Sequence, residues 1–225
     1  MQDFIYCAPT RVIFGKDTEL QVGKILKEAG ATCVLLQYGG GSIKKSGLYD
    51  RVVQAVREAG IELYEIGGVQ PNPHLSLVRE AIALAREKKV DYLLAVGGGS
   101  AIDSTKATAV GVPYEGDVWD FYCGKAGPVT KALPVGCVVT IAASGSEGST
   151  DSVVTLVTED GKQYKRCADG DILRPEVFSG NLAGCLEALK DSDDPAVRAL
   201  ADGELAPLLQ NKELLNAYMG LMIGG

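Results

Sequence analysis

Residues 91–106 constrain the fold more than any other stretch of this chain, and they read DYLLAVGGGSAIDSTK. The apolar run at 92–96 predicts a buried strand, and the pattern that opens at Ser100 predicts a helix over 100–111. The three glycines between them let an anion approach the backbone without meeting a Cβ. A helix N-terminus offers free N–H groups and the positive end of its dipole to such an anion. We therefore expect a nucleotide phosphate to bind here.

Strands and helices alternate along most of the chain, which is typical of βαβ units with a parallel sheet. We therefore predict an α/β fold, a Rossmann-like parallel sheet with helices on both faces. The expected strands are 4–7, 11–14, 33–36, 61–66, 92–96 and 133–140, and the expected helices are 17–29, 46–59, 75–87 and 100–111. We expect a loop or short helix at 117–121 and a hairpin formed by 152–158 and 162–167.

Composition excludes several classes of function. The net charge is −7 and the basic residues are scattered, so we expect no nucleic-acid partner. No apolar run approaches ~18 residues, so we expect no membrane span. The first residues lack the pattern of a secretory signal. The six cysteines show no C-x-x-C spacing, which indicates reduced thiols and a cytoplasmic location.

Two more loops rich in small residues follow predicted strands, at 37–45 and 140–147. A single glycine triplet is often only a turn. Three such loops after three parallel strands fall at one edge of the sheet, where open α/β folds bind their ligands. The pattern therefore favours a binding site over three unrelated turns.

These segments together resemble the iron-containing (group III) alcohol dehydrogenases, specifically their butanol-dehydrogenase-like branch. The resemblance runs in order from about residue 3 to 178, and the G-x-G-x-x-G fingerprint is absent. The matching stretches are 38–45, 70–73, 96–103 with Lys106, 117–121 and 134–147. The resemblance implies a nucleotide-binding α/β domain over 1–178, which we predict to bind NADP(H). In the family, a helical metal-binding domain follows, and the two domains reversibly reduce an aldehyde to an alcohol with hydride from NAD(P)H.

The resemblance also implies which residues contact the nicotinamide cofactor. One group lines the pyrophosphate, a second flanks the rest of the cofactor, and one lysine reaches the nicotinamide ribose. The residues that line the pyrophosphate are Gly98, Gly99, Ser100 and Asp103. Those that flank the rest of the cofactor are Asn72, Thr140, Ile141 and Ser149, and the lysine is Lys162. The loop after the second strand of the nucleotide-binding pattern adds Gly39, Gly40 and Ser42.

We predict NADP(H) as the preferred cofactor and NAD as the less favoured one. Enzymes that use NAD usually place a carboxylate after the second strand to bind the ribose 2′-OH. Here that place holds Gly39, with Ser42, Lys44 and Lys45 nearby. A hydroxyl and ammonium groups accept a 2′-phosphate that a carboxylate would repel. The alternative interpretation is that both lysines are solvated residues on a helix surface.

The family's metal centre is not matched. The resemblance implies iron, or zinc in its place, held by one aspartate and three histidines and polarising the substrate carbonyl. This chain has one histidine, His74, in the cofactor half. We therefore predict a truncated form that keeps the NADP(H) site, lacks the metal ligands and is inactive alone. A small aldehyde or alcohol would react only if another chain supplied a metal domain.

The pattern departs from the family near 174–178, and a short helical tail is predicted over 179–225. This tail could cover the sheet face that the helical domain normally buries, or be a remnant or a fusion. Its acidic residues near 191–194 fit a solvated loop and helix cap. A non-catalytic nucleotide-binding or interaction module and a degraded, marginally stable frame remain alternatives. An exposed sheet face and an apolar tail make a homodimer a further possibility.

Overall fold

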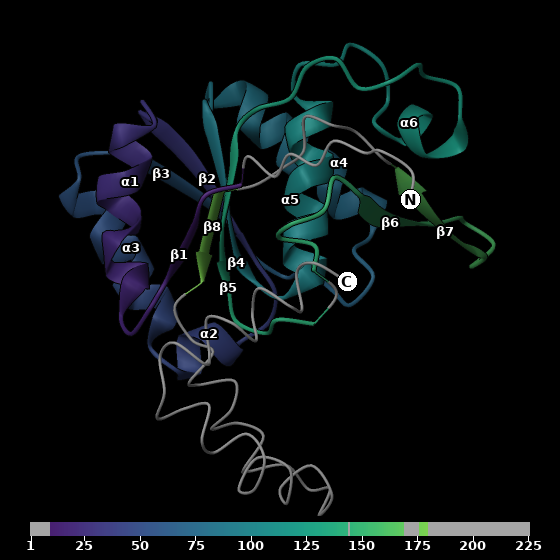
Figure 1. Ribbon diagram of the computed structural model, residues 1–225. Helices are drawn as coiled ribbons and strands as arrows, with labels where there is room; N and C mark the ends of the chain where they lie inside the picture. Colours follow the sequence, from purple (N-terminus) through teal and green to yellow (C-terminus); the bar gives the residue numbers. More distant parts are fainter. Residues whose placement is uncertain (1–9, 144, 169–175, 180–225) are drawn as a thin grey trace, which may run out of the picture.

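The structure is a computed structural model that describes residues 10–143, 145–168 and 176–179 (Figure 1). The expected strand at 4–7 lies outside these residues, and so does the expected helical tail at 179–225 except for Ser179, which ends strand β8 (Glu176–Ser179). The described part contains a six-stranded sheet in the order β1-β8-β5-β4-β2-β3, in which every neighbouring pair is parallel. Its strands are β1 (Val12–Phe14), β2 (Cys33–Tyr38), β3 (Glu62–Ile66), β4 (Tyr92–Gly97), β5 (Val135–Val139) and β8 (Glu176–Ser179).

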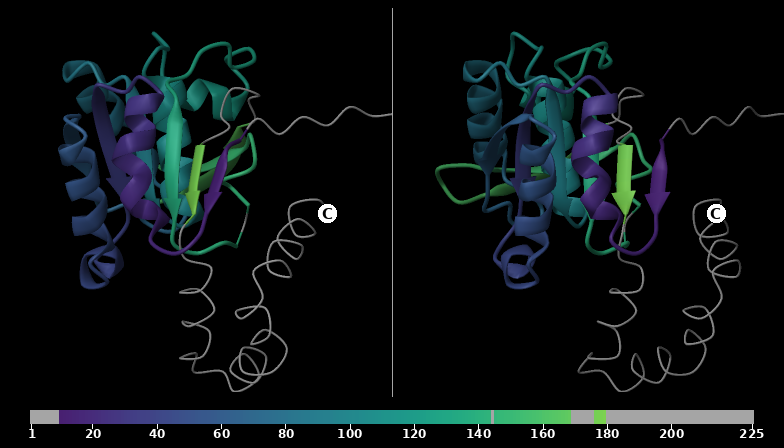
Figure 2. Two further views of the ribbon diagram at one scale, coloured as in Figure 1. Left: turned by 60° about the vertical axis from the view of Figure 1, so that its left-hand side comes forward. Right: turned by 90° about the vertical axis from the view of Figure 1, so that its left-hand side faces the viewer.

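Helices cover both faces of this sheet, as the two turned views show (Figure 2). The 3-10 helix η1 and α1 and α3 pack on one face, and α4 and α5 on the other. Their bounds are η1 (Thr18–Gln21), α1 (Val22–Glu28), α2 (Ser42–Lys45), α3 (Leu48–Glu58), α4 (Leu75–Glu87), α5 (Gly99–Gly111) and α6 (Trp119–Cys123). The predicted fold class, a Rossmann-like parallel sheet with helices on both faces, is therefore confirmed.

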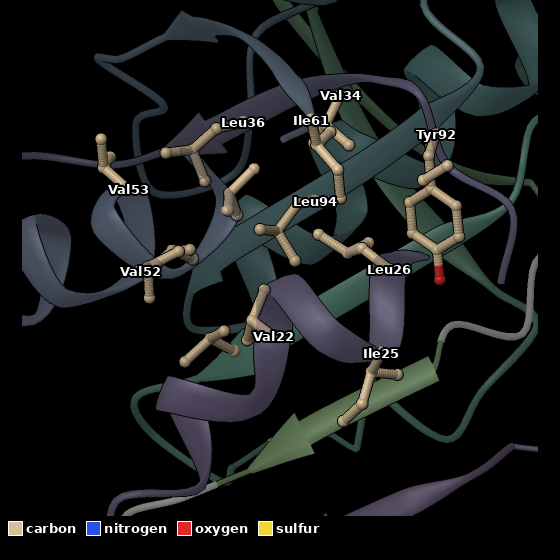
Figure 3. Packing of buried hydrophobic residues seen from close by; sticks show 14 of the residues in the cluster. Val22, Ile25, Leu26, Val34, Leu36, Val52, Val53, Ile61, Tyr92 and Leu94 are labelled. Atoms are coloured by element: carbon tan, nitrogen blue, oxygen red, sulfur yellow. The ribbon is translucent and has the colours of Figure 1, made fainter. Parts of the chain in front are cut away.

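Alternation along the strands explains the two layers. Because successive strand side chains point to opposite faces, Val34 and Leu36 join the core under α1 and α3, while Leu35 joins the core under α4 and α5. In the first core, Val22 and Leu26 of α1 lie over the strands (Figure 3). Strands buried on both faces need apolar residues at every position, and β4 is buried along its whole length.

A two-stranded antiparallel hairpin stands beside this sheet and consists of β6 (Ser152–Val157) and β7 (Gln163–Ala168). It packs against α4 and α5 through a third apolar cluster that includes Leu75, Ala107 and Val154. The hairpin was predicted at this place, over 152–158 and 162–167, and the observed strand ends differ from these by no more than one residue. None of the described helices is long and apolar enough to cross a membrane.

Three details differ from the sequence analysis. The expected helix at 17–29 divides into η1 and α1, and the expected helix at 46–59 begins at Leu48 after the separate turn α2. Strand β8 was not predicted, since 176–179 contains only two apolar residues in a row. It lies between β5 and β1 and pairs with both, so its place is set by long-range pairing.

The strand order contains one reversal that bears on ligand binding. From β2 the chain passes to β3 at one edge, then returns to β4 on the other side of β2. The helices that follow β2 and β4 therefore lie on opposite faces of the sheet, on either side of the carboxyl ends of these two strands. Open α/β sheets bind their ligands at such a reversal.

Candidate nucleotide-binding site

The three glycine-rich or small-residue loops follow three adjacent strands, β2, β4 and β5. The register aligns the strand ends, because Tyr38 of β2 pairs with Val96 of β4 and Gly97 of β4 pairs with Val139 of β5. The backbone N–H of Thr140 donates to the carbonyl oxygen of Gly97 at 3.0 Å, which joins the second loop to the third. The predicted convergence of the three loops at one edge is thus present in the structure.

The N-terminus of α5 forms the centre of the site. Gly98 is its N-cap in an extended conformation, and its carbonyl accepts from the N–H groups of Ala101 and Ile102. No side chain of the described residues caps this end. Among the described residues, a Cβ on Gly98 would have only Ile141 Cβ within 4 Å, at 3.9 Å, so the space beside the backbone is open. The first N–H groups of α5 are therefore available to an anion.

Gly97 has a different reason to be glycine. A Cβ at this position would lie 2.8 Å from the Cβ of Ala101, closer than real side chains approach. The turn from β4 into α5 thus depends on a missing side chain at Gly97, whereas Gly98, Gly99 and Ser100 form its partly exposed surface. These three residues were predicted to line the pyrophosphate, and the structure places them at the helix N-terminus that suits this contact.

The loop after β2 lies beside this helix end and is anchored to the segment after β3. Gly68 N–H donates to Gly39 carbonyl at 3.1 Å, and Val69 N–H donates to the Tyr38 carbonyl at 3.1 Å. Gly39 is half-buried, and a Cβ at this position would come within 3.3 Å of the Val69 carbonyl oxygen, so there is little room for a side chain. Gly40 and Ser42 are exposed and face solvent.

A cluster that the sequence analysis missed surrounds Lys44. Its ammonium lies 5.0 Å from the ring centroid of Tyr38 and 4.6 Å from that of Tyr49. Both tyrosine hydroxyls donate to Oε2 of Glu65, at 3.1 Å and 2.6 Å. The hydrogen bond to Glu65 raises the pKa of Tyr49 to about 12. The interaction with Tyr38 raises the pKa of Lys44, so this lysine is a fixed cation at the end of β2.

The third loop carries Thr140, Ile141 and Ser149. Ile141 is 63% exposed although it is a large apolar side chain, and it lies directly beside Gly98. Thr140 and Ser149 are partly buried. An exposed apolar side chain next to an open helix N-terminus provides a surface on which the planar part of a ligand can pack.

Asp103 does not lie at this open surface. It is 9% exposed, and its Oδ2 accepts from Val153 N–H of β6 at 3.2 Å. Burial, the largest effect, raises the pKa of this carboxyl, against the opposing influence of the Val153 N–H and Lys106. Its Oδ1 has no hydrogen-bond partner among the described residues. The structure therefore directs Asp103 toward the hairpin, one turn into α5, and not toward the first N–H groups of the helix.

Lys162, which was predicted to reach the nicotinamide ribose, is not the lysine that contacts Asn72. Lys162 lies in the hairpin turn and forms an exposed ion pair with Asp160, with Nζ and Oδ2 2.6 Å apart. Lys165 of β7 instead donates from Nζ to Oδ1 of Asn72 at 2.6 Å. Thr155, which pairs with Lys165 across the hairpin, donates its N–H to the Pro73 carbonyl at 2.8 Å. No local pattern in the sequence distinguishes these two lysines.

The described residues do not fit the family's metal. Across 10–143, 145–168 and 176–179, no three or more His, Cys, Asp or Glu side chains come together in a way that could hold an ion. The single histidine of the sequence, His74, is the half-buried N-cap of α4 and pairs with Thr155 in an isolated bridge. Within the part of the chain that the structure describes, no ligand set therefore forms around His74.

The reversal in strand order and the open end of α5 are typical of a nucleotide-binding α/β domain. Comparison with known proteins is more specific. Residues 9–177 match the family model described as iron-containing alcohol dehydrogenase, so the chain belongs to that family.

Curated relatives agree with this assignment. A probable NADH-dependent butanol dehydrogenase 2 of Bacillus subtilis (strain 168) is 52% identical over 155 residues, which cover 69% of this chain and 39% of that protein. The NADPH-dependent aldehyde reductase of Escherichia coli (strain K12) is 39% identical over 165 residues, which cover 72% of this chain and 42% of that protein. The chain thus spans about two fifths of the length of these relatives.

A solved structure shows the same fold. The crystal structure of NADH-dependent butanol dehydrogenase A from Thermotoga maritima aligns with a TM-score of 0.79 and 42% identity, covering 85% of this chain and 47% of the other. The resemblance inferred from the glycine-rich motifs is therefore confirmed at the level of sequence and of fold.

Proposed function

We propose that this chain binds NAD(P)(H) and is the cofactor-binding part of an alcohol dehydrogenase or aldehyde reductase. The observation that carries the proposal is the open N-terminus of α5, with room at Gly98, at the strand-order reversal and between two further loops. The names of the relatives from Bacillus subtilis and Escherichia coli, which mention NADH and NADPH, support a nicotinamide cofactor.

In this proposal each loop contacts a different part of the dinucleotide. The α5 N-terminus binds the diphosphate through backbone N–H groups. The loop at 39–42 lies next to the adenosine ribose, and the loop that starts at Thr140 and Ile141 packs against the rest of the cofactor together with Ser149. Asn72 completes the site, and we assign the neighbouring lysine to Lys165 instead of Lys162 because only Lys165 contacts Asn72.

We further propose a preference for NADP(H). No carboxylate follows β2, and Lys44 is held as a cation over Tyr38, at the end of that strand. A fixed ammonium two residues after Ser42 in the sequence suits a 2′-phosphate, although Glu65 nearby offsets part of its charge. The similar proteins bear the names of both NADH- and NADPH-dependent enzymes, so the preference rests on these side chains alone.

Fluorescence titration of the full chain with NADPH and NADH tests both proposals. We expect tighter binding of NADPH. Replacement of Lys44 by Met should weaken the binding of NADPH about tenfold, which corresponds to a loss of about 1.4 kcal/mol, and leave the affinity for NADH almost unchanged. Lys45→Met, one residue away and exposed, is the matched control and should change neither. Equal or tighter binding of NADH by the unaltered chain would refute the preference. Binding of neither cofactor would refute the function.

Catalysis by the chain alone is a separate question. Reduction of an aldehyde in this family requires a metal that polarises the carbonyl, and the sequence has one histidine where three are needed. We propose that the chain carries the cofactor part over 1–178 and is inactive by itself, with a nucleotide-binding module as the second candidate. The assay is the loss of NADPH absorbance with butyraldehyde, with and without Fe(II) or Zn(II). Metal-dependent turnover by the 225-residue chain would overturn this part of the proposal.

A further inference from the structure

The side chain of Lys106 is fully buried, which is rare for a lysine. It lies in the middle of α5 with 0% of its surface exposed. Removing an ammonium group from water is costly unless each of its protons finds an acceptor. Burial is the main effect that lowers the pKa of Lys106, against the opposing charge of Asp103. A residue that is retained at such a cost needs a specific partner.

That partner is the backbone of the segment that connects the third loop, at 140–147, to β6. Lys106 Nζ donates to the carbonyl oxygens of Ser149 and Asp151, each at 2.8 Å, and lies 3.5 Å from Ser149 Oγ. Three acceptors match the three donors of an ammonium. The residues that Lys106 contacts lie 43 and 45 positions further along the chain. They form the irregular segment that leads from the loop into β6.

The same helix therefore holds two parts of the site. The N-terminus of α5 forms the open end at Gly98, and Lys106 lies eight residues later, about 12 Å along the axis. The segment that Lys106 binds contains Ser149 and is continuous with the loop that begins at Thr140. An ammonium bound to two carbonyl oxygens at once fixes the position of that segment relative to the helix N-terminus.

We propose that Lys106 is a positioning residue that holds the 149–151 segment against α5, so that the loop over the cofactor is already in its binding conformation. This proposal rests on the proposed function, since it assigns Lys106 to the nicotinamide side of the same site. Lys106 does not touch the cofactor and acts through the loop. Its loss should affect ligands that need the third loop and spare ligands that need only the first two.

Two probes separate these effects. ADP carries the adenosine and the diphosphate, so it engages the loop at 39–42 and the α5 N-terminus, whereas NADPH also engages the third loop. The variant Lys106→Met removes all three donors and keeps an unbranched side chain of nearly the same length. In this variant we expect the Kd for NADPH to rise about tenfold and the Kd for ADP to stay within about twofold. Calorimetric titration of the full chain measures both.

Thr108→Val is the matched control. Thr108 is equally buried on α5, but its hydroxyl donates only to the Ser104 carbonyl within the same helix. This variant should change neither Kd. If Lys106→Met fails to fold, Lys106→Gln, which keeps two N–H donors, should show a smaller selective loss of NADPH affinity. An equal loss of ADP and NADPH affinity, or no loss of either, would overturn the proposal.

Hydrogen exchange tests the loop directly, independently of ligand. Amides in 145–151 should exchange about tenfold faster in Lys106→Met than in the unaltered chain, while those in β4 remain unchanged. If the unaltered chain binds neither ADP nor NADPH, the proposed function fails, and the exchange result alone decides whether Lys106 holds the loop. Unchanged exchange across 145–151 would refute the positioning role.

Discussion

Replacement of Gly98 by Asp should raise stability and strongly weaken cofactor binding. Gly98 is the N-cap of α5 and has φ −90° and ψ −167°, which an aspartate can adopt. Aspartate is a better N-cap than glycine by a few tenths of a kcal/mol, and its charge at the positive end of the helix adds about 0.3–1 kcal/mol. The nearest atom to its Cβ would be Ile141 Cβ at 3.9 Å, so no clash opposes this gain.

The same charge opposes a diphosphate. Two unit charges at about 5 Å, with an effective dielectric constant of about 20, repel by about 3 kcal/mol, which is roughly a 200-fold loss of affinity. The carboxylate would also accept hydrogen bonds from the N–H groups that the phosphate needs. Stability and binding should therefore change in opposite directions, which a general loss of structure cannot produce.

The assay combines thermal unfolding with fluorescence titration of NADPH. For a chain of this size, each kcal/mol shifts Tm by about 2–4 °C, so a rise of a few degrees is measurable. Gly98→Asn is the matched control, because it has the same shape and can cap the helix but adds no charge; it should lose much less affinity. If Gly98→Asp folds and binds NADPH as the unaltered chain does, the phosphate does not bind at the N-terminus of α5.

Three further predictions concern packing, pH and the hairpin. Gly23→Ala should destabilise the chain by at least about 1–3 kcal/mol, because its Cβ would lie 1.9 Å from the Ala55 carbonyl oxygen; Gly127→Ala, with nothing within 4 Å, is the control in urea denaturation. Asp103→Asn should be more stable than the unaltered chain at pH 7 and should lose this advantage as the pH falls. The reason is that burial raises the pKa of Asp103, so the folded state is destabilised only where the carboxyl is ionised. A larger stability advantage at pH 5 than at pH 7 would contradict this. Lys165→Met should weaken NADPH binding, while Lys162→Met should not, and the reverse result in titration would restore the first assignment.

Much of the fold was predictable because its determinants are local. The apolar runs that become β2 and β4 are contiguous, and the glycines that end them stand next to the strands they terminate. Parallel pairing then places the ends of these strands at one edge. The glycines at 97–99 therefore marked the correct helix N-terminus before any contact was known. Strand β8 could not be found in this way, since its four residues are a strand only because β1 and β5 lie on either side.

The parts of the site that the sequence left open all depend on side chains that meet across the fold. Register in the β6–β7 hairpin, and its docking on Pro73, decides that Lys165 contacts Asn72, 93 residues away. The pairing of β2 with β3 brings Glu65 to the two tyrosines beside Lys44. The sequence by itself determined the α/β class, the family and the glycine-rich turn at the N-terminus of α5, because these follow from patterns within a few residues. Only the tertiary structure decided which charged side chains hold the surrounding loops, because a buried lysine such as Lys106 acquires its partners from packing.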